Sequence, residues 1–337
     1  MEDLSTQSVK TNSDQNIDSN DTLKYQGRYR GRHEIGLCPE VVASPTKVLN
    51  CEKKIKHKEF IPYKMFSMMD FPEHYRDIDL LQIVHIIAFL TVKIIVKCVS
   101  QDRPLLDEFN QPYPLAEFRG SEDSHFGTGR IGTVWSYSEN DDKPCPCSKC
   151  HNSGNPTKVW GLIRVITAVH VVFDQKEALR SECLFGFDSL DAVPTLLEGV
   201  GMERADTNDD RCHLSCVTHD VSLLQKIKPK WSSYPIYHSN VLKKFTALDD
   251  KLVIIVAHPH GCPKQVSIGD WIYRDETGDK SSEGHPYVKY NYTTATCQGS
   301  SGATLYILGR KWKLWYNQVH SGYDSNNRFN YSGTGCD

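Results

Sequence analysis

The sequence has almost no excess charge of either sign. Among its 337 residues, 39 are Lys or Arg and 42 are Asp or Glu, which gives a net charge of −3 and a pI of about 6.5. A face that neutralises phosphates needs a clear excess of Lys and Arg. The balance therefore excludes a strong nucleic-acid-binding footprint, and we interpret the short basic run KKIKHK at 53–58 as a solvated face or flexible tail.

The beginning of the chain lacks the features of a secretory signal. It reads MEDLSTQSVKTNSDQNIDSND, which is acidic and polar where a signal peptide has a basic start and an apolar core. We therefore expect a cytoplasmic or otherwise intracellular location. The twelve cysteines are then expected to be free thiols or metal ligands rather than a disulfide framework.

The sequence also lacks an apolar run free of charge that could span a membrane. The stretch LLQIVHIIAFLTVKIIVKCV at 80–99 has about the right length, but His85, Lys93 and Lys97 interrupt it. From Thr91 onward its residues are β-branched and partly alternating. We predict a lead-in helix over 71–90 that continues into a buried strand, and no membrane partner.

No internal repeat has a fixed period, and residues 1–70 are mostly polar, so we expect a disordered or partly helical N-terminal extension. From residue 91, ten short β-branched runs are separated by Gly, Pro and Asn clusters, which is typical of all-β sandwiches and barrels. A polar stretch at 229–250 is interpreted as a linker. The length fits two compact units, and the sequence predicts them at 91–228 and 251–337.

Three short motifs carry residues that acyl-transfer chemistry needs. CQGSSGATLY at 297–306 places Ser301 in a Gly/Ser loop, VITAVHVVFD places His170 at the end of an apolar strand, and HDVSLL presents Asp220. Each has a bland interpretation: a tight turn, a packed histidine, a capping aspartate. A nucleophile, however, needs a base, and the base needs an orienting acid. The chain offers all three types in the order His, Asp, Ser.

These motifs resemble those of the chymotrypsin-like (trypsin-like) serine proteases. ITAVH resembles LTAAH, HDVSLL resembles D-[IV]-A-L-L, and GSSGA resembles G-D-S-G-G. The similarity covers roughly residues 90–335 and extends to uncharacterised trypsin-like peptidase-domain proteins of invertebrates. It implies two six-stranded antiparallel Greek-key barrels with the site in the cleft between them. GTGRIGTV at 127–134 resembles a structural strand of the family's first barrel.

The resemblance also implies roles for individual residues. His170 would be the general base, Asp220 would hold its imidazole in the right tautomer, and Ser301 would attack the scissile carbonyl. The backbone N–H groups of Gly299 and Ser301 would form the oxyanion hole. The family needs no cofactor, and its partners are peptide or protein substrates.

Two departures from the family pattern matter. Ser300 replaces the Asp of G-D-S-G-G, and no I-[IV]-G-G start is visible, so the zymogen switch of secreted members is expected to be absent. Ala303 replaces the last glycine, which is a mild change. A catalytically inactive protease-fold binding protein therefore stays open as the alternative to a serine endopeptidase.

Substrate preference is read from positions flanking the nucleophile. Ala295 stands where trypsin has an acidic pocket floor, which argues against cleavage after Lys or Arg. Thr296 and His320 resemble the pocket residues with which bacterial glutamyl endopeptidases and picornaviral main proteases bind Glu or Gln. Ser321 and Gly322 would pair with substrate backbone as an added strand. A strand histidine with its own partner is the competing interpretation of His320.

Two Cys/His clusters remain. KPCPCSKCHNSG offers Cys145, Cys147, Cys150 and His151 as ligands for a structural zinc, with reduced or redox-active loop thiols as the alternative. AHPHGCPKQ contains His258, His260 and Cys262, which we interpret as a shaped loop rather than a metal cage. A metal-dependent hydrolase would need three ligands beside an open position, and the sequence does not indicate such a convergence.

Overall fold

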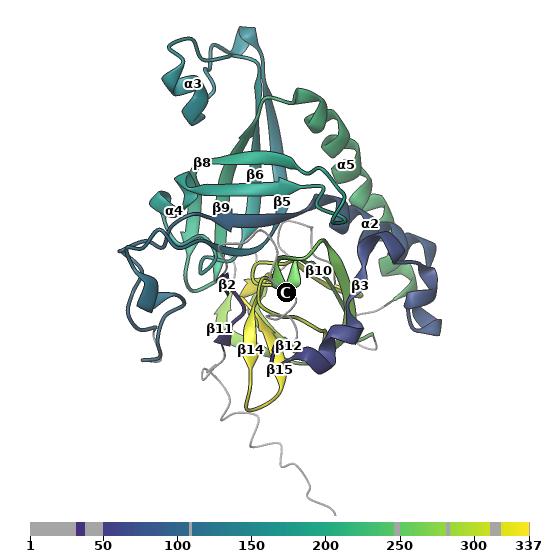
Figure 1. Cartoon of the computed structure of the whole chain (residues 1–337). Coiled ribbons are helices and arrows are strands. Elements are labelled where there is room, and N and C mark those ends of the chain that lie inside the picture. Colours follow the sequence, from purple (N-terminus) through teal and green to yellow (C-terminus); the bar gives the residue numbers. More distant parts are fainter. Residues whose placement is uncertain are drawn as a thin grey trace, which may run out of the picture.

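A computed structural model describes residues 32–37, 50–107, 110–245, 250–280, 284–310 and 318–336. Most of these residues form two antiparallel sheets, which lie above and below one another in Figure 1. The predicted all-β class with two barrel-like units is thus confirmed. Residues 1–31 of the predicted N-terminal extension lie outside the described residues.

The first sheet closes on itself. Strand β5 pairs with β4 and with β6, and the other pairings run β4–β7–β8–β9–β6, so six strands form a complete ring. Short strand β2 adds to the outside of β5. The strands are β2 (Gly36–Leu37), β4 (Thr91–Val96), β5 (His125–Tyr137), β6 (Trp160–Thr167), β7 (Ser181–Phe185), β8 (Thr195–Asp206) and β9 (Arg211–Thr218).

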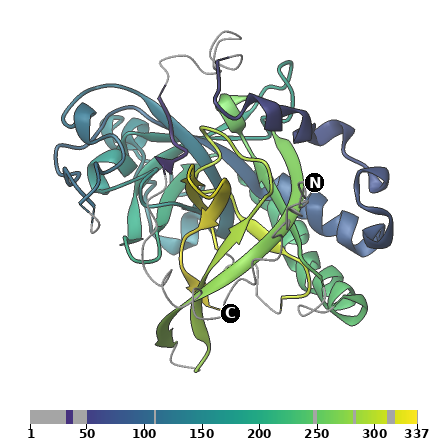
Figure 2. The same ribbon diagram turned by 90° about the horizontal axis from the view of Figure 1, so that it is seen from below.

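The second sheet has the order β1-β14-β15-β12-β11-β10-β13, and a bridge between Thr304 and Val319 brings its two ends together. Its C-terminal strands (yellow) lie near the middle of the view from below in Figure 2. The strands are β1 (Arg32–His33), β3 (Ile61–Pro62), β10 (Leu252–Ala257), β11 (Gln265–Lys280), β12 (Pro286–Tyr292), β13 (Leu305–Ile307), β14 (His320–Asp324), β15 (Phe329–Ser332) and β16 (Gly335–Cys336).

Helices join the two sheets. Helix α2 begins after Asp77, whose carboxylate accepts from the N–H groups of Asp79 and Leu80. The chain then runs directly into β4, as the change of pattern at Thr91 predicts. The helices are α2 (Ile78–Leu90), α3 (Ser148–Asn152), α4 (Gln175–Leu179) and α5 (Val221–Lys244), and the 3-10 turns are η2 (Lys54–Glu59), η3 (Tyr63–Met65), η4 (Met68–Asp70), η5 (Glu73–Tyr75), η6 (Ala116–Phe118), η7 (Glu139–Asp141) and η8 (Pro259–Gly261).

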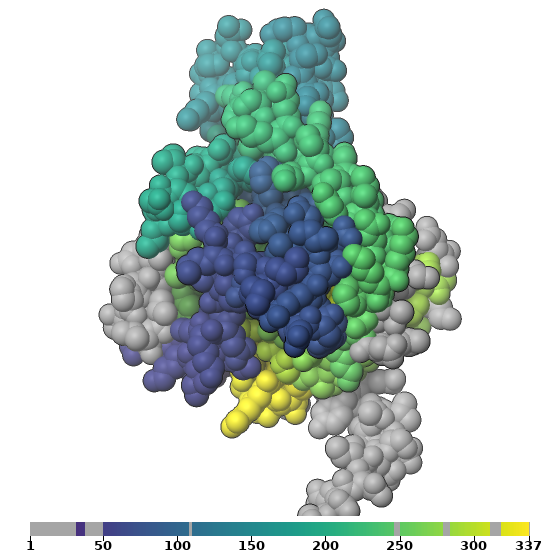
Figure 3. Space-filling model, turned by 90° about the vertical axis from the view of Figure 1, so that its right-hand side faces the viewer, coloured from purple at the N-terminus to yellow at the C-terminus, as the bar shows by residue number. Residues whose placement is uncertain are grey.

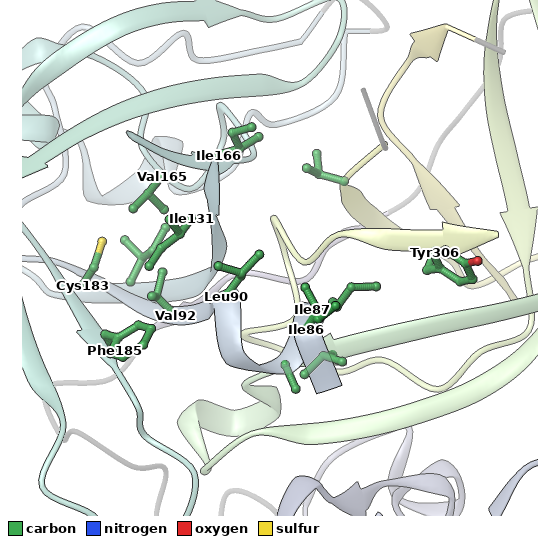
Figure 4. Packing of buried hydrophobic residues seen from close by; sticks show 14 of the residues in the cluster. Ile86, Ile87, Leu90, Val92, Ile131, Val165, Ile166, Cys183, Phe185 and Tyr306 are labelled. Atoms are coloured by element: carbon green, nitrogen blue, oxygen red, sulfur yellow. The ribbon is translucent and has the colours of Figure 1, made fainter. Parts of the chain in front are cut away.

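The largest core runs from one sheet to the other through α2. Ile86, Ile87 and Leu90 lie between Val92 of the first sheet and Tyr306 of the second (Figure 4). All five side chains are almost fully buried. This continuous apolar contact joins the two sheets through one core.

Most of the predicted linker at 229–250 lies in a long helix. Residues 221–244 form α5, whose buried residues recur at helical spacing: Leu223, Leu224, Ile227, Tyr234, His238 and Val241. Two interior prolines and many polar residues hide this pattern in the sequence. In Figure 3, α5 (green) lies beside the purple and blue chain that leads into and includes α2, and Lys244 pairs with Asp77 and Asp79. Within the described residues, no helix combines the length and apolar character that crossing a bilayer requires.

Candidate active site

His170 lies in the turn that follows β6 and is buried. Its Nδ1–H donates to both carboxylate oxygens of Asp210, at 2.9 and 2.8 Å, and its backbone N–H donates to the same carboxylate at 3.3 Å. The hydroxyl of Ser321 also donates to Asp210. Burial alone would raise the pKa of Asp210, but the nearby His170 ring and these hydrogen bonds overcome it and lower the pKa to about 2. Asp210 is therefore an ionised acceptor that holds Nδ1 protonated.

The acid that orients His170 is thus Asp210, and the choice of Asp220 is wrong. Asp220 caps α5: its Oδ1 accepts from the N–H groups of Ser222 and Leu223 at 3.0 and 3.3 Å, and the side chain is exposed. The apolar residues that follow it start a helix instead of continuing a strand. Asp210 sits in the polar turn between β8 and β9 with a φ of +48°, a conformation that Asp tolerates better than most residues.

Ser301 lies in a loop whose glycines are required by close approach. At Gly302, with φ +83°, an added Cβ would lie 2.1 Å from Thr167 Oγ1 and 2.3 Å from the carbonyl oxygen of Thr128. The N–H of Thr128 donates to the Ser301 carbonyl at 2.8 Å, and the N–H of Gly302 donates to that of His320 at 2.8 Å. Hydrogen bonds to both sheets therefore fix the loop.

The loop and the His170 turn meet at Gly127. An added Cβ there would lie 2.7 Å from Val171 and 3.0 Å from the Ser301 carbonyl oxygen. Both Ser301 Oγ and His170 Nε2 are buried, and neither has a hydrogen-bond partner among the described residues. Buried polar atoms without partners are rare in folded proteins and are expected where chemistry uses them. The segments that carry the serine and the histidine predicted from the sequence motifs thus both lie beside Gly127.

The predicted oxyanion-hole residue Gly299 already has a carbonyl in front of it. Its φ is +93°, and its N–H donates to the backbone oxygen of Glu34 at 2.6 Å. Glu34 belongs to the N-terminal segment 32–37, which was expected to be loosely attached. Instead its residues pair with strands of both sheets, His33 with Gly322 of β14 and Gly36 with Phe126 of β5.

The side chain of Glu34 enters a polar pocket. His320 Nε2–H donates to its carboxylate at 2.7 Å, and Lys53 Nζ donates to the other oxygen at 2.7 Å. Lys53 also donates to the hydroxyl of Thr296 at 2.9 Å and to Asn330 Oδ1 at 2.9 Å. Burial would raise the pKa of Glu34, but Lys53 and His320 outweigh it and lower the pKa to about 2.

Further pocket residues were missed in the sequence. Lys53, assigned to a solvated face or tail, contacts three oxygens here because the chain after residue 50 folds back onto the second sheet. The Tyr292 hydroxyl lies 2.5 Å from His320 Nδ1, so it can donate there and leave Nε2–H to donate to the carboxylate. Burial lowers the pKa of His320, which favours this neutral ring.

The cysteine loop gathers around a different histidine from the one predicted. Cys145, Cys147 and Cys150 lie 3.2, 3.6 and 3.5 Å from Nε2 of His219, measured from Sγ. His151, on α3, is exposed and does not belong to this group. The cysteines that the structure describes form no disulfide with one another.

A second group joins residues from three distant parts of the chain. Cys51 Sγ lies 3.7 Å from Cys297 Sγ, Cys297 Sγ lies 3.3 Å from His57 Nε2, and His57 Nε2 lies 3.2 Å from His260 Nε2. The interpretation of 257–271 as a loop without ligands is therefore incomplete for His260. His258 instead donates from Nδ1 to the Cys262 carbonyl at 2.9 Å.

No protein-family model matches the chain, and no curated protein matches it in sequence. Several solved structures are similar to it. The Rv3671c protease from M. tuberculosis in its active form is 14% identical, with 77% of this chain and 82% of that one covered and a TM-score of 0.40. The HtrA-type protease AlgW with a decapeptide is 12% identical (75% and 63% covered, TM-score 0.36), and a serine endoprotease from Yersinia pestis is 12% identical (76% and 61% covered, TM-score 0.37). All three are proteases, but at these scores the likeness carries no weight for function, which depends on the chain's own geometry.

Proposed function

We propose that this chain is a serine endopeptidase in which His170, Asp210 and Ser301 act together. The observation that carries the proposal is that Ser301 Oγ and His170 Nε2 are both buried without a hydrogen-bond partner among the described residues, while the other ring nitrogen of His170 is held by an ionised Asp210. His170 would take the proton of Ser301 as the hydroxyl attacks a peptide carbonyl. It would then pass that proton to the leaving amine, and water would release the acyl group.

The loop around Ser301 supplies the electrostatic half of the mechanism. The N–H of Gly299 donates to a peptide carbonyl oxygen, the group that becomes an oxyanion on attack. A donor fixed in this position stabilises the developing charge without reorganising, and removing one typically costs about 10²–10³ in kcat. Gly299 cannot be replaced without moving its neighbours, because a Cβ would lie 2.5 Å from Phe126 and 2.6 Å from the His258 carbonyl oxygen.

The preferred residue before the scissile bond is Glu. The pocket presents two donors, His320 Nε2–H and Lys53 Nζ, to the two oxygens of one carboxylate. A Gln side chain could accept from only one of them, and its NH₂ would face the other donor. Hydrogen bonds to charged groups contribute about 1.5–3 kcal/mol, so we expect Glu to be preferred over Gln by about 10- to 100-fold in kcat/KM.

A labelling experiment tests the catalytic proposal. A fluorophosphonate probe should modify Ser301 in the full chain carrying Glu34→Ala, which weakens the hold of residues 32–37 on the cleft. The matched variant with Ser301→Ala added should stay unlabelled. Absence of labelling in a folded Glu34→Ala chain would refute the catalytic role and favour the inactive binding protein.

The cysteine loop would hold a structural zinc through Cys145, Cys147, Cys150 and His219. Zn–S and Zn–N bonds of about 2.3 and 2.05 Å at the tetrahedral angle imply S–N separations of roughly 3.6 Å. The three observed separations of 3.2–3.6 Å fit that value. Four protein ligands close such a site, so its contribution would be to folding of the loop and not to the reaction. We expect one zinc per chain to depend on Cys147, measured as metal content of a Cys147→Ser variant.

A further inference from the structure

Residues 32–37 cross the cleft as an extended strand that bonds to both sheets. On one side Arg32 and His33 pair with Tyr323 and Gly322 of β14, and on the other Gly36 and Leu37 pair with Phe126 and His125 of β5. Strand addition of this kind is how peptide-binding sites hold extended substrates. Between these two strand pairings lie residues 34 and 35, and the Glu34 carbonyl accepts from Gly299 of the Ser301 loop.

Glycines mark both points where the backbones approach. A Cβ on Gly322 would lie 2.6 Å from the Arg32 carbonyl oxygen, and one on Gly36 would lie 2.1 Å from the Phe126 ring. Each side of the crossing thus requires a residue without a side chain, one in the cleft wall and one in the crossing segment. The fit is specific to this segment's sequence.

Both the carbonyl oxygen and the side chain of Glu34 are bound by residues of the candidate site. Its carbonyl oxygen accepts from the Gly299 N–H at 2.6 Å, and its side chain fills the pocket formed by Lys53 and His320. The preceding residue, His33, packs its ring against that of His170 with centroids 4.2 Å apart. Its Nδ1–H donates to the Ser321 carbonyl at 3.1 Å. These contacts hold the Glu34 carbonyl oxygen at the Gly299 N–H and the preceding residue against the catalytic histidine.

The geometry points to self-processing: this chain cleaves its own Glu34–Ile35 peptide bond. The inference rests on the proposed serine-peptidase activity and adds the substrate. Ser301 Oγ would bond to the Glu34 carbonyl carbon while His170 takes the hydroxyl proton. The C–N bond to Ile35 would break as His170 protonates the leaving nitrogen. Water would then hydrolyse the ester, giving one fragment that ends in the Glu34 carboxylate and a chain that begins with the Ile35 amine.

The first measurement is the intact mass and N-terminal sequence of the purified full chain. We expect a chain that begins at Ile35, formed at a rate independent of protein concentration because the segment already lies in its own cleft. Ser301→Ala should leave residues 1–337 intact. Glu34→Ala should slow processing by more than 100-fold, whereas Glu73→Gln, the loss of an exposed glutamate elsewhere, should have no effect.

A second substrate separates failure of this inference from failure of the proposed function. The peptide RYRGRHEIGL, which copies residues 28–37, is added to the Glu34→Ala chain. Cleavage of the peptide after its glutamate together with an intact wild-type chain would overturn self-processing, and the segment would then be a tethered inhibitor. No peptide cleavage and no fluorophosphonate labelling of Ser301 would overturn the peptidase activity itself. Processing with a rate proportional to protein concentration would refute cleavage within one molecule.

Independent distances indicate a second metal site beside the same loop. Tetrahedral zinc with Cys and His ligands implies separations of roughly 3.8 Å for S–S, 3.6 Å for S–N and 3.4 Å for N–N. The corresponding separations among Cys51, Cys297, His57 and His260 are 3.7, 3.3 and 3.2 Å. Four atoms of the right types at these distances form a closed ligand set.

We infer that Cys51, His57, His260 and Cys297 bind a structural zinc that anchors residues 50–60 to the second sheet. Lys53 lies in this segment, and Cys297 opens the loop that carries Gly299 and Ser301, so the ion would fix one wall of the Glu34 pocket. The N–H of His260 donates to the carbonyl of Gln298 at 2.6 Å, which ties the same ligand to the loop.

Metal content tests this site without any activity measurement. Purified wild-type chain should contain two zinc ions, and both Cys51→Ser and Cys147→Ser should contain one, each from a different cluster. Cys336→Ser, which changes a cysteine outside both clusters, should retain two. A wild-type content of one ion that Cys51→Ser leaves unchanged would overturn the second site, as would a content of zero.

Discussion

Replacing Asp210 by Asn tests which carboxylate orients the histidine. In the wild type, both Asp210 oxygens accept from His170 Nδ1–H, at 2.8 and 2.9 Å. An amide NH₂ facing Nδ1 would favour the other tautomer, which puts the ring's proton on Nε2, where the base must receive one from Ser301. The negative charge that stabilises the imidazolium would also be lost. For this substitution in such a triad, kcat falls about 10⁴-fold, which corresponds to about 5.5 kcal/mol in the activation barrier.

The effect on stability is smaller and has a definite dependence on pH. Because the pKa of Asp210 is lowered from 3.8 to about 2, its ionised form stabilises the fold above pH 4, and that contribution is lost as the pH falls toward 2. The shift corresponds to about 2 kcal/mol. We therefore expect Asp210→Asn to stay folded at neutral pH while losing nearly all of its kcat.

Asp220→Asn is the matched control. Asn is as good a helix cap as Asp, so the fold and the activity should both stay near those of the wild type. The assay is cleavage of a Glu-containing peptide, with thermal unfolding of each variant measured alongside. Full activity in Asp210→Asn, or a 10³-fold or larger loss in Asp220→Asn, would refute the assignment of Asp210.

Three other substitutions or titrations have defined outcomes. Gly302→Ala should destabilise the fold by several kcal/mol, because its Cβ would lie 2.1 Å from Thr167 Oγ1 at a φ of +83°. The control Gly154→Ala, where φ is +67° and no atom lies near the new Cβ, should cost about 1–2 kcal/mol in thermal unfolding. Arg103→Ala should destabilise by about 3–5 kcal/mol in urea unfolding, because it leaves buried Glu177 without its ion pair at 2.7 Å, and a near-neutral result would contradict this. Docking of residues 32–37 in Ser301→Ala should weaken as pH falls from about 6.5 toward 3. Burial lowers the pKa of docked His33 to about 3, and nearby His170 lowers it further while Asp210 opposes the shift. The released segment therefore binds a proton that the docked segment excludes. Hydrogen exchange of residues 32–37 would measure this, and docking that strengthens on acidification would contradict it.

The parts of the site that the sequence predicts are those set by local motifs. The apolar strand before His170 and the paired glycines around Ser301 dictate a buried turn and a strained loop, and both are encoded within about ten residues. The ten β-branched runs likewise indicate two β units. The sequence does not predict the acid that orients His170. Asp210 sits in the turn TNDDRC, where no apolar periodicity distinguishes it from a solvated aspartate.

Contacts between distant segments were beyond the sequence for a related reason. Lys53 and Glu34 lie in a stretch whose polar composition is typical of disorder, and their partners Thr296 and His320 are more than 240 residues away. Only the closed fold brings the four together, where Lys53 and His320 compensate the burial of the Glu34 carboxylate and Thr296 accepts from Lys53. His219 joins the cysteine loop in the same way, from the end of β9, whereas adjacent His151 is exposed on α3.

The pocket that would select a substrate glutamate is also the pocket that Glu34 of the same chain occupies. While the chain is intact, residues 32–37 would compete with any external substrate of the proposed peptidase at the effective concentration of a tethered ligand, in the millimolar range for short tethers. After cleavage, the part that fills the Glu34 pocket is no longer attached, so dilution alone frees the pocket. The new Ile35 amine needs no buried carboxylate to receive it, since Ser300 occupies the position beside the nucleophile and instead accepts from the Cys297 N–H at 3.1 Å. Activation of the proposed peptidase would therefore consist of releasing the segment from a site that is already formed. In secreted chymotrypsin-like proteases, by contrast, a new N-terminus pairs with an aspartate.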